Sequence, residues 1–146
     1  MIAAFLLALS GPLTPPPEEL AGHFHGAIWY DLERNALIGN GNWPAALWYQ
    51  GGSDEGPILH IQNLRCRRTG GRRYQCAFDL YRDGGPVMTI YNEMAPDRLS
   101  CTATLVHERE EGEWVWFVRH SPPPPSGGHS RTSLQCDPPG ADPAGS

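Results

Sequence analysis

Hydrophobic and polar residues alternate with a period of two along the second half of the chain, as in β-strands that bury one face. In residues 74–81 one face carries four alternating residues, namely Tyr74, Cys76, Phe78 and Leu80. Residues 99–106 repeat the pattern with Leu99, Cys101, Ala103 and Leu105. Residues 87–92 and 114–119 add two strands, and Gly-rich turns separate the segments. The pattern predicts an antiparallel meander.

A further strand is expected over residues 58–66, but its alternation breaks in the middle. Leu59 and Ile61 fall on one face, whereas Leu64 and Cys66 fall on the other. A β-bulge adds one residue to a strand and would return all of these side chains to the same face. We therefore predict a bulge near residues 62–63.

Between residues 18 and 34 the apolar positions follow a helical spacing instead. Residues three or four apart form one stripe, made of Leu20, Phe24, Ala27, Ile28 and Leu32. Pro17 suits a first helical turn, and Glu18 and Glu19 complement the positive end of the helix dipole. Gly22 and Gly26 disfavour a helix, so a strand with Phe24, Gly26, Ile28 and Tyr30 on one face is the alternative. We favour the helix.

A Gly-rich loop is expected over residues 35–43, and a short second helix over residues 43–49.

Proline and glycine gather near both ends and divide the chain into four parts. Residues 1–10 form a signal-like segment, residues 11–17 a Pro-rich linker, and residues 18–121 a single α+β domain. Residues 122–146 form a Pro/Gly-rich C-terminal tail tethered through Cys136, in which residues 130–136 are either a short strand or part of the tether. We expect an α+β fold in which an N-terminal helical segment packs on a four- or five-stranded antiparallel β-meander with two disulfides.

The composition narrows the class of protein. The chain has 146 residues and a formal net charge of −5, with 40 % hydrophobic and 18 % charged residues. These values exclude a highly charged disordered chain and disfavour a dedicated nucleic-acid-binding protein, which is usually basic. Residues 2–9 are apolar and precede small residues, as in a secretory signal; a frayed apolar N-terminus is the alternative. No transmembrane span is expected, because a span needs about 20 apolar residues.

Four cysteines in a small chain with a signal-like start predict two disulfides and an oxidising compartment. Cys66 and Cys76 flank one turn and would face each other across a hairpin. Cys101 would then pair with Cys136 and hold the C-terminal segment against the sheet. Buried free thiols are the alternative. The chain has no Cys-x-x-Cys motif, which disfavours a redox centre or a zinc knuckle.

One turn between predicted strands is rich in arginine. It carries Arg65, Arg67, Arg68, Arg72 and Arg73. Guanidinium groups bind phosphate and carboxylate groups through paired hydrogen bonds, so this turn is a candidate anion-binding site. The alternatives are a solvated hairpin tip, or arginines neutralised by the acidic turn at residues 108–113.

No residue pattern assigns a catalytic or metal-binding role. His23 and His25 would share one face of a strand but point apart on a helix, and zinc needs three or four converging ligands. Asp79 and Tyr81 share one strand face, yet nothing marks either as an acid or a base. Motifs of serine hydrolases, phosphate-binding loops and dinucleotide binding are absent from the sequence. We expect no metal and no cofactor, and we expect most aromatic residues to fill the core.

These observations together predict a small exported protein, secreted or periplasmic, that acts as a non-enzymatic binding module. Its partner would be an envelope protein, a glycan or an anionic surface rather than nucleic acid. The alternative is a cone-shaped pocket protein, either an enzyme or a small-ligand carrier, with its cavity between helix and sheet. A filled helix–sheet interface would favour the first prediction, and an open pocket lined by Asp, His or Tyr the second.

Overall fold

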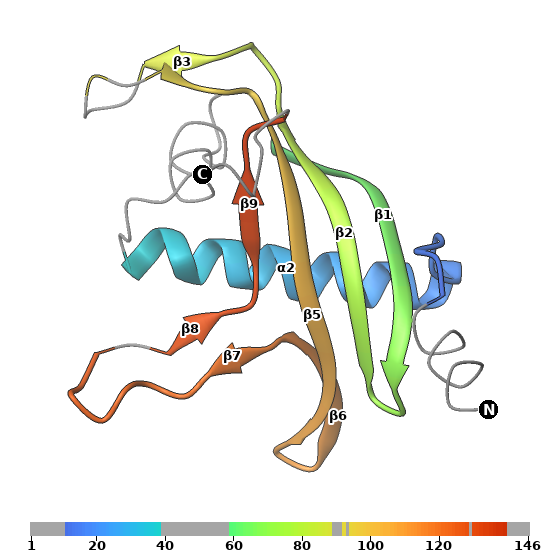
Figure 1. Cartoon of the computed structure of the whole chain (residues 1–146). Coiled ribbons are helices and arrows are strands. Elements are labelled where there is room, and N and C mark those ends of the chain that lie inside the picture. The colour runs from blue at the N-terminus through green and yellow to red at the C-terminus, as the bar shows by residue number, and fades with distance from the viewer. Residues whose placement is uncertain (1–10, 39–58, 89–91, 93, 129, 140–146) are drawn as a thin grey trace.

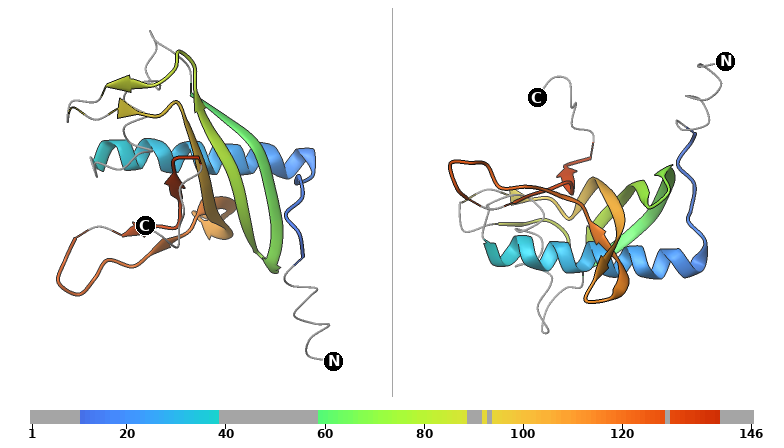
Figure 2. Two further views of the ribbon diagram at one scale, coloured as in Figure 1. Left: turned by 45° about the horizontal axis from the view of Figure 1, so that its top comes forward. Right: turned by 90° about the horizontal axis from the view of Figure 1, so that it is seen from below.

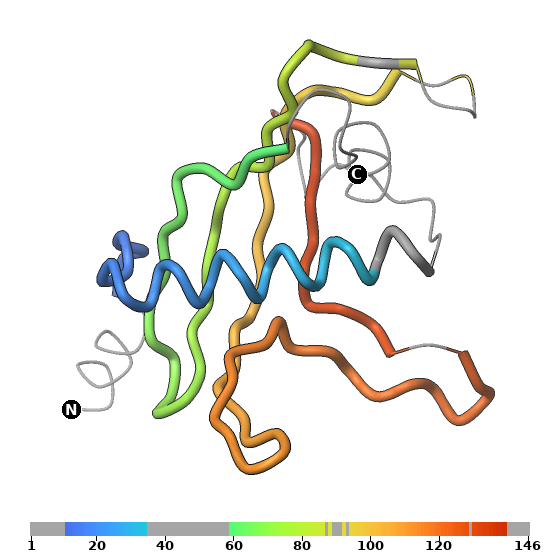
Figure 3. Tube along the Cα trace, turned by 180° about the vertical axis from the view of Figure 1, so that it is seen from behind, coloured from blue at the N-terminus to red at the C-terminus, as the bar shows by residue number. Residues whose placement is uncertain are grey.

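One long helix lies across one face of a curved antiparallel sheet. The computed structural model describes residues 11–38, 59–88, 92, 94–128 and 130–139. In Figure 1 the helix α2 (Glu18–Ile38) runs behind the sheet, and Figure 3 shows it from the opposite side. The two layers confirm the predicted α+β fold class. The signal-like segment at residues 1–10 and the predicted second helix at residues 43–49 lie outside the described residues.

The buried side of α2 is the apolar stripe that the helical spacing predicts. Phe24, Ile28 and Leu32 are completely buried, and Ala27 is 7 % exposed. The helix is confirmed and the alternative of a strand is wrong. The stripe outweighs the two glycines, because burying each large apolar side chain contributes about 1.5–3 kcal/mol.

The helix is longer than expected. A loop was predicted from residue 35, whereas α2 continues to Ile38. Ala36 and Leu37 are strong helix formers, and the next glycine comes only at position 39. The prediction of a loop at residues 35–38 is therefore wrong, and the rest of that loop lies outside the described residues.

The main sheet has five strands in the order β1-β2-β5-β6, with β9 also paired to β5. Its strands are β1 (Leu59–Gly70), β2 (Arg73–Arg82), β5 (Arg98–Glu110), β6 (Glu113–Val118) and β9 (Gln135–Asp137). All neighbours in this sheet are antiparallel. The strands predicted at residues 58–66, 74–81, 99–106 and 114–119 are confirmed as β1, β2, β5 and β6.

The strand predicted over residues 87–92 differs from the structure. Here β3 (Val87–Met88) pairs with β4 (Met94–Ala95) in a separate two-stranded sheet. Gly84 and Gly85 have φ values of 92° and 80°, which glycine adopts readily, and they turn the chain at the end of β2. The β3–β4 hairpin therefore projects from the main sheet, and β5 pairs with β2 directly (Figure 1).

The bulge predicted in β1 is confirmed. The register with β2 shifts between Gln62 and Arg65, and Asn63 adopts a left-handed φ of 56°. As a result Leu59 and Leu64, on the two sides of the break, are both buried in the core. The sheet packs on α2 through a core that also includes Phe78, Leu80, Leu99, Leu105, Val118 and Leu134.

One edge of β5 is shared by two segments. Residues 105–110 pair with β6, and residues 100–102 pair with β9. Between them the Ser133 hydroxyl accepts a hydrogen bond from the Thr104 amide at 3.1 Å, so the backbone is also satisfied where the partner changes. The segment at residues 130–136 thus contains strand, in β8 (Arg131–Thr132) and β9.

Between β6 and β9 the chain forms a second hairpin outside the main sheet. In it β7 (His120–Ser121) pairs with β8, and residues 122–125 are the four prolines of its loop. Figure 2 shows that this hairpin extends past the end of the sheet.

The two disulfides are those predicted, Cys66–Cys76 and Cys101–Cys136. In each case the two cysteines are direct cross-strand partners, with Cα atoms 4.1 Å apart. The alternative of free thiols is wrong, because no free cysteine is present. The first bond joins β1 to β2, and the second holds β9 against β5.

Candidate functional site

The strand register separates the five arginines of the β1–β2 turn. Arg65 lies opposite Ala77 and Arg67 lies opposite Gln75, and these positions alternate with the buried Cys66–Cys76 pair. Arg73 precedes Gln75 by two residues and is on the same face. We call these three residues, Arg65, Arg67 and Arg73, the outer arginines, because they lie on the sheet face that points away from α2.

The other two arginines make contacts within the protein. Arg68 donates from Nε to the Gly70 carbonyl and from an Nη to the Gly71 carbonyl, both at 3.0 Å. Arg72 places its guanidinium 3.7 Å from the centre of the Trp114 ring, a cation–π contact. These contacts stabilise the turn and its packing on β6, so Arg68 and Arg72 are less available to a ligand than the outer arginines.

No carboxylate among the described residues forms an ion pair with the outer arginines. Within the described part of the chain, Arg98 lies 3.5 Å from the Asp79 carboxylate, and the imidazoles of His60 and His120 contact the carboxylates of Asp83 and Asp31. The acidic turn between β5 and β6 makes no ion pair with them. Arg67 also has a buried Nε without a hydrogen-bond partner among the described residues.

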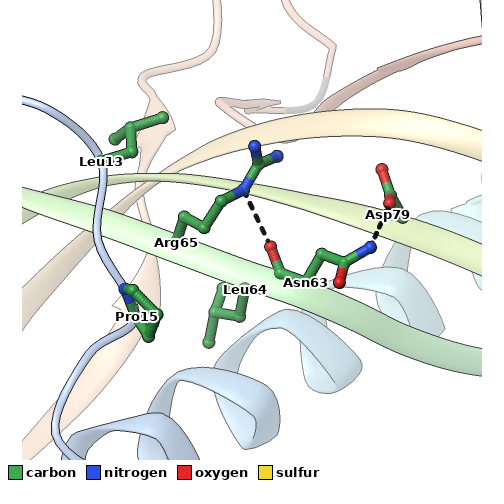
Figure 4. Close-up of a pocket in the computed structure, with 6 residues that line it drawn as sticks. All are labelled: Leu13, Pro15, Asn63, Leu64, Arg65 and Asp79. Atoms are coloured by element: carbon green, nitrogen blue, oxygen red, sulfur yellow. Dashed lines mark hydrogen bonds between the residues drawn. The ribbon is translucent and has the colours of Figure 1, made fainter.

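A pocket of about 540 Å³ lies beside Arg65 at the edge of β1. Figure 4 shows Leu13 and Pro15 on one side, and Arg65, Asn63 and Asp79 on the other. The Arg65 Nε donates to the Asn63 carbonyl at 3.0 Å, which orients the guanidinium group (Figure 4). The pocket therefore combines an apolar wall with one oriented cation and the carboxylate of Asp79.

The N-terminal wall of this pocket is held by the sheet itself. Thr14 and Cys66 exchange backbone hydrogen bonds of 3.0 and 2.7 Å. Residues 13–15 consequently follow the free edge of β1 and cover part of it, which reduces unwanted strand pairing.

Asp79 is positioned by neighbours rather than left as a free acid or base. It accepts a hydrogen bond from the Asn63 amide at 2.7 Å and lies 3.5 Å from an Nη of Arg98. Tyr81 is on the same face, and the central guanidinium carbon of Arg98 lies 5.1 Å from the centre of the Tyr81 ring. This arrangement supports a structural role for both residues.

Some aromatic side chains are buried in the core, whereas other aromatic side chains and two histidines are exposed. Tyr74 and Trp116 contact Phe24 and complete the core, whereas Tyr30 and Trp114 are 51 % and 44 % exposed. His23 and His25 are on the helix and exposed. Across the described ranges no three His, Cys, Asp or Glu side chains come together as a metal site would require.

A polar cluster that the sequence patterns did not indicate joins α2 to the β7–β8 hairpin. Asp31 is almost completely buried, and one of its carboxylate oxygens accepts a hydrogen bond from His120 Nε2. The other oxygen accepts from the Thr132 hydroxyl at 2.6 Å. The Nδ1 of His120 lies 2.9 Å from the Ser130 hydroxyl. We call Asp31, His120, Ser130 and Thr132 the polar cluster.

Sequence reasoning missed the polar cluster because the two residues that contact Asp31, His120 and Thr132, are 89 and 101 positions away in the sequence. The available signal was Asp31 itself, an acidic residue between Ile28 and Leu32 of the buried stripe, where an unpaired charge would be costly.

Comparison with known families, curated proteins and solved structures finds no match for this chain. The function is therefore argued from the sites alone.

Proposed function

We propose that this protein is a binding domain that recognises an anionic group through its outer arginines. The observation that carries the proposal is the placement of Arg65, Arg67 and Arg73 on one sheet face, where no carboxylate of the described residues pairs with them. Figure 1 shows that no described element covers this face, since α2 lies behind the sheet. A phosphate or carboxylate group of the partner would accept paired hydrogen bonds from the guanidinium groups.

The packing between helix and sheet supports binding at the surface. Phe24, Phe78 and Leu80 are at most 1 % exposed, so large apolar side chains pack at this interface. The alternative of a ligand cavity between helix and sheet would need an opening there. The pocket lies at the sheet edge instead and is lined by Arg65, one of the outer arginines.

The compartment follows from the cysteines. Two disulfides in a small domain are typical of an extracellular or otherwise oxidising environment. No helix in the described part of the chain has the length and hydropathy needed to cross a membrane. We propose that the protein is secreted or periplasmic, with residues 1–10 as its export signal. Its partner would then be an anionic glycan or protein of the cell envelope.

Retention on phosphocellulose tests the proposal. The whole protein is acidic, with a net charge of −5, so retention at neutral pH would require a local basic surface. We expect the wild type to be retained at low ionic strength. The triple variant Arg65→Gln/Arg67→Gln/Arg73→Gln should bind at least about tenfold more weakly, because it loses three charge-assisted donors.

A matched control comes from the same chain. Arg34→Gln/Arg119→Gln/Arg131→Gln changes the net charge by the same amount at three other exposed arginines. We expect this variant to be retained like the wild type. Equal retention of both triple variants, with circular dichroism showing that both are folded, would refute a specific role for the outer arginines.

A further inference from the structure

The polar cluster places a serine, a histidine and a buried aspartate in sequential hydrogen-bond contact. We propose that Ser130 is a nucleophile activated by His120, with Asp31 as the positioning residue, and that it reacts with carboxylic esters that have a good leaving group. A hydroxyl beside an imidazole that a carboxylate orients is the general arrangement of an activated serine. This activity would be additional to the proposed binding function.

The hydrogen bonds determine which nitrogen of His120 carries its proton. The amide of Leu134 donates to the Thr132 hydroxyl at 3.1 Å, so that hydroxyl is free to donate its own proton to Asp31. With an ionised Asp31 accepting at both oxygens, neutral His120 must carry its proton on Nε2. The lone pair of Nδ1 then faces Ser130 and accepts the hydroxyl proton.

The proposed chemistry needs a carboxylate that is more buried than the histidine and the serine. The side chain of Asp31 is 4 % exposed and that of His120 is 19 % exposed. Ser130 is half-buried, at the end of the hairpin loop whose residues 121–128 are exposed. The carboxylate is thus shielded from water, which strengthens its effect on His120, while Ser130 keeps part of its surface exposed.

The reaction balances with water as the only co-reactant. The Ser130 Oγ forms a bond to the ester carbonyl carbon while its proton moves to His120 Nδ1. The bond from that carbon to the leaving oxygen then breaks, and His120 returns the proton to the leaving alcohol or phenol. Water afterwards attacks the acyl-serine, gives its proton to His120, and Ser130 recovers its proton as the carboxylic acid departs.

Acetylation by p-nitrophenyl acetate tests the proposal. We expect nitrophenol release from the wild type, and peptide mapping of briefly treated protein should find the acetyl group on Ser130. Ser130→Ala should abolish this adduct. Ser126→Ala removes an exposed serine of the same loop and should leave acetylation of Ser130 unchanged.

Asp31→Asn tests the positioning role. Its amide oxygen would still accept from Thr132, but its NH₂ group would donate to His120 Nε2 and so move the imidazole proton to Nδ1. His120 would then donate to Ser130 instead of accepting. We expect acetylation of Ser130 to slow by about 10²-fold or more. Nitrogen NMR of the imidazole should show the Nε2–H form in the wild type and its loss in Asp31→Asn.

These measurements separate reactivity from a purely structural role. A cluster that only anchors the hairpin would lose stability in Asp31→Asn, yet wild-type Ser130 would remain unacetylated. Absence of the Ser130 adduct in folded wild type would therefore overturn the proposal. So would acetylation of Ser130 at an equal rate in wild type and in folded Asp31→Asn.

Discussion

Single residues with left-handed backbone angles mark the points where the chain turns. Gly112 has a φ of 86° in the turn between β5 and β6, and Asn63 has a φ of 56° in the bulge of β1. Both residue types tolerate this region better than others do. Gly22 and Gly26 are different, because they lie inside α2, where a Cβ at either position would meet nothing within 4 Å. Glycine is thus required in the turn but not in the helix.

Replacing a helical glycine should stabilise the protein. Gly26→Ala is expected to raise the free energy of unfolding by about 0.5–1 kcal/mol, because alanine loses less backbone entropy on folding into a helix. Gly112→Ala should lower it by about 1–2 kcal/mol, because a Cβ is unfavourable at that φ. Urea unfolding followed by circular dichroism measures both. A destabilised Gly26→Ala variant would contradict the exposed placement of Gly26.

Among the elements, β5 has the most partners in the main sheet. It pairs with β2 along one edge, and with β6 and β9 along the other. The alternation of Leu99, Cys101, Ala103 and Leu105 predicts its buried face correctly, because a strand's side chains alternate whatever its partners are. The alternation does not reveal which segments pair with the two edges of β5, because that depends on residues far away in the sequence.

Removing the second disulfide should release β9. The Cys101–Cys136 disulfide joins residues that are 35 positions apart in the sequence. Its loss in Cys101→Ala/Cys136→Ala should lower the free energy of unfolding by about 4 kcal/mol, according to the loop-entropy treatment. Limited proteolysis should then cleave within residues 122–137 far faster than in the wild type. The Cys66–Cys76 disulfide closes a shorter loop, so its loss in Cys66→Ala/Cys76→Ala should cost about 3 kcal/mol.

The variant Cys66→Ala/Cys76→Ala, which lacks the first disulfide, serves as a control for the effect on β9. It should leave the C-terminal segment protected, since β9 stays bonded to β5. Equal protection of that segment in both double variants would show that strand pairing alone holds β9 in place.

At the scale of the whole molecule, the described residues build a small core from helix α2 and the main sheet, reinforced by two disulfides. The two disulfides together contribute about 7 kcal/mol in the same treatment, which is comparable with the total stability of about 5–15 kcal/mol of an ordinary domain. We therefore expect the fold to depend on oxidation, in agreement with the proposed exported location.

Reduction should consequently abolish most of the stability. We expect the oxidised protein to have no titratable thiol and a cooperative urea transition. With dithiothreitol all four thiols should titrate, and the transition midpoint should fall strongly or vanish at 25 °C. An unchanged midpoint after complete reduction would show that the noncovalent core alone is sufficient.

Local regularities of the sequence were enough to predict the helix, the four long strands, the bulge and both disulfide pairs. The helix, the strands and the bulge depend on the period of side chains along one segment, and Cys66–Cys76 depends on neighbours across one turn. Cys101–Cys136 spans 35 positions and followed only as the pair that remained. The position of the β3–β4 hairpin, the division of the outer arginines from Arg68 and Arg72, and the polar cluster depend on how distant segments meet. Asp31 and His120 become partners only because α2 and the β7–β8 hairpin pack together, and that contact is a property of the folded chain.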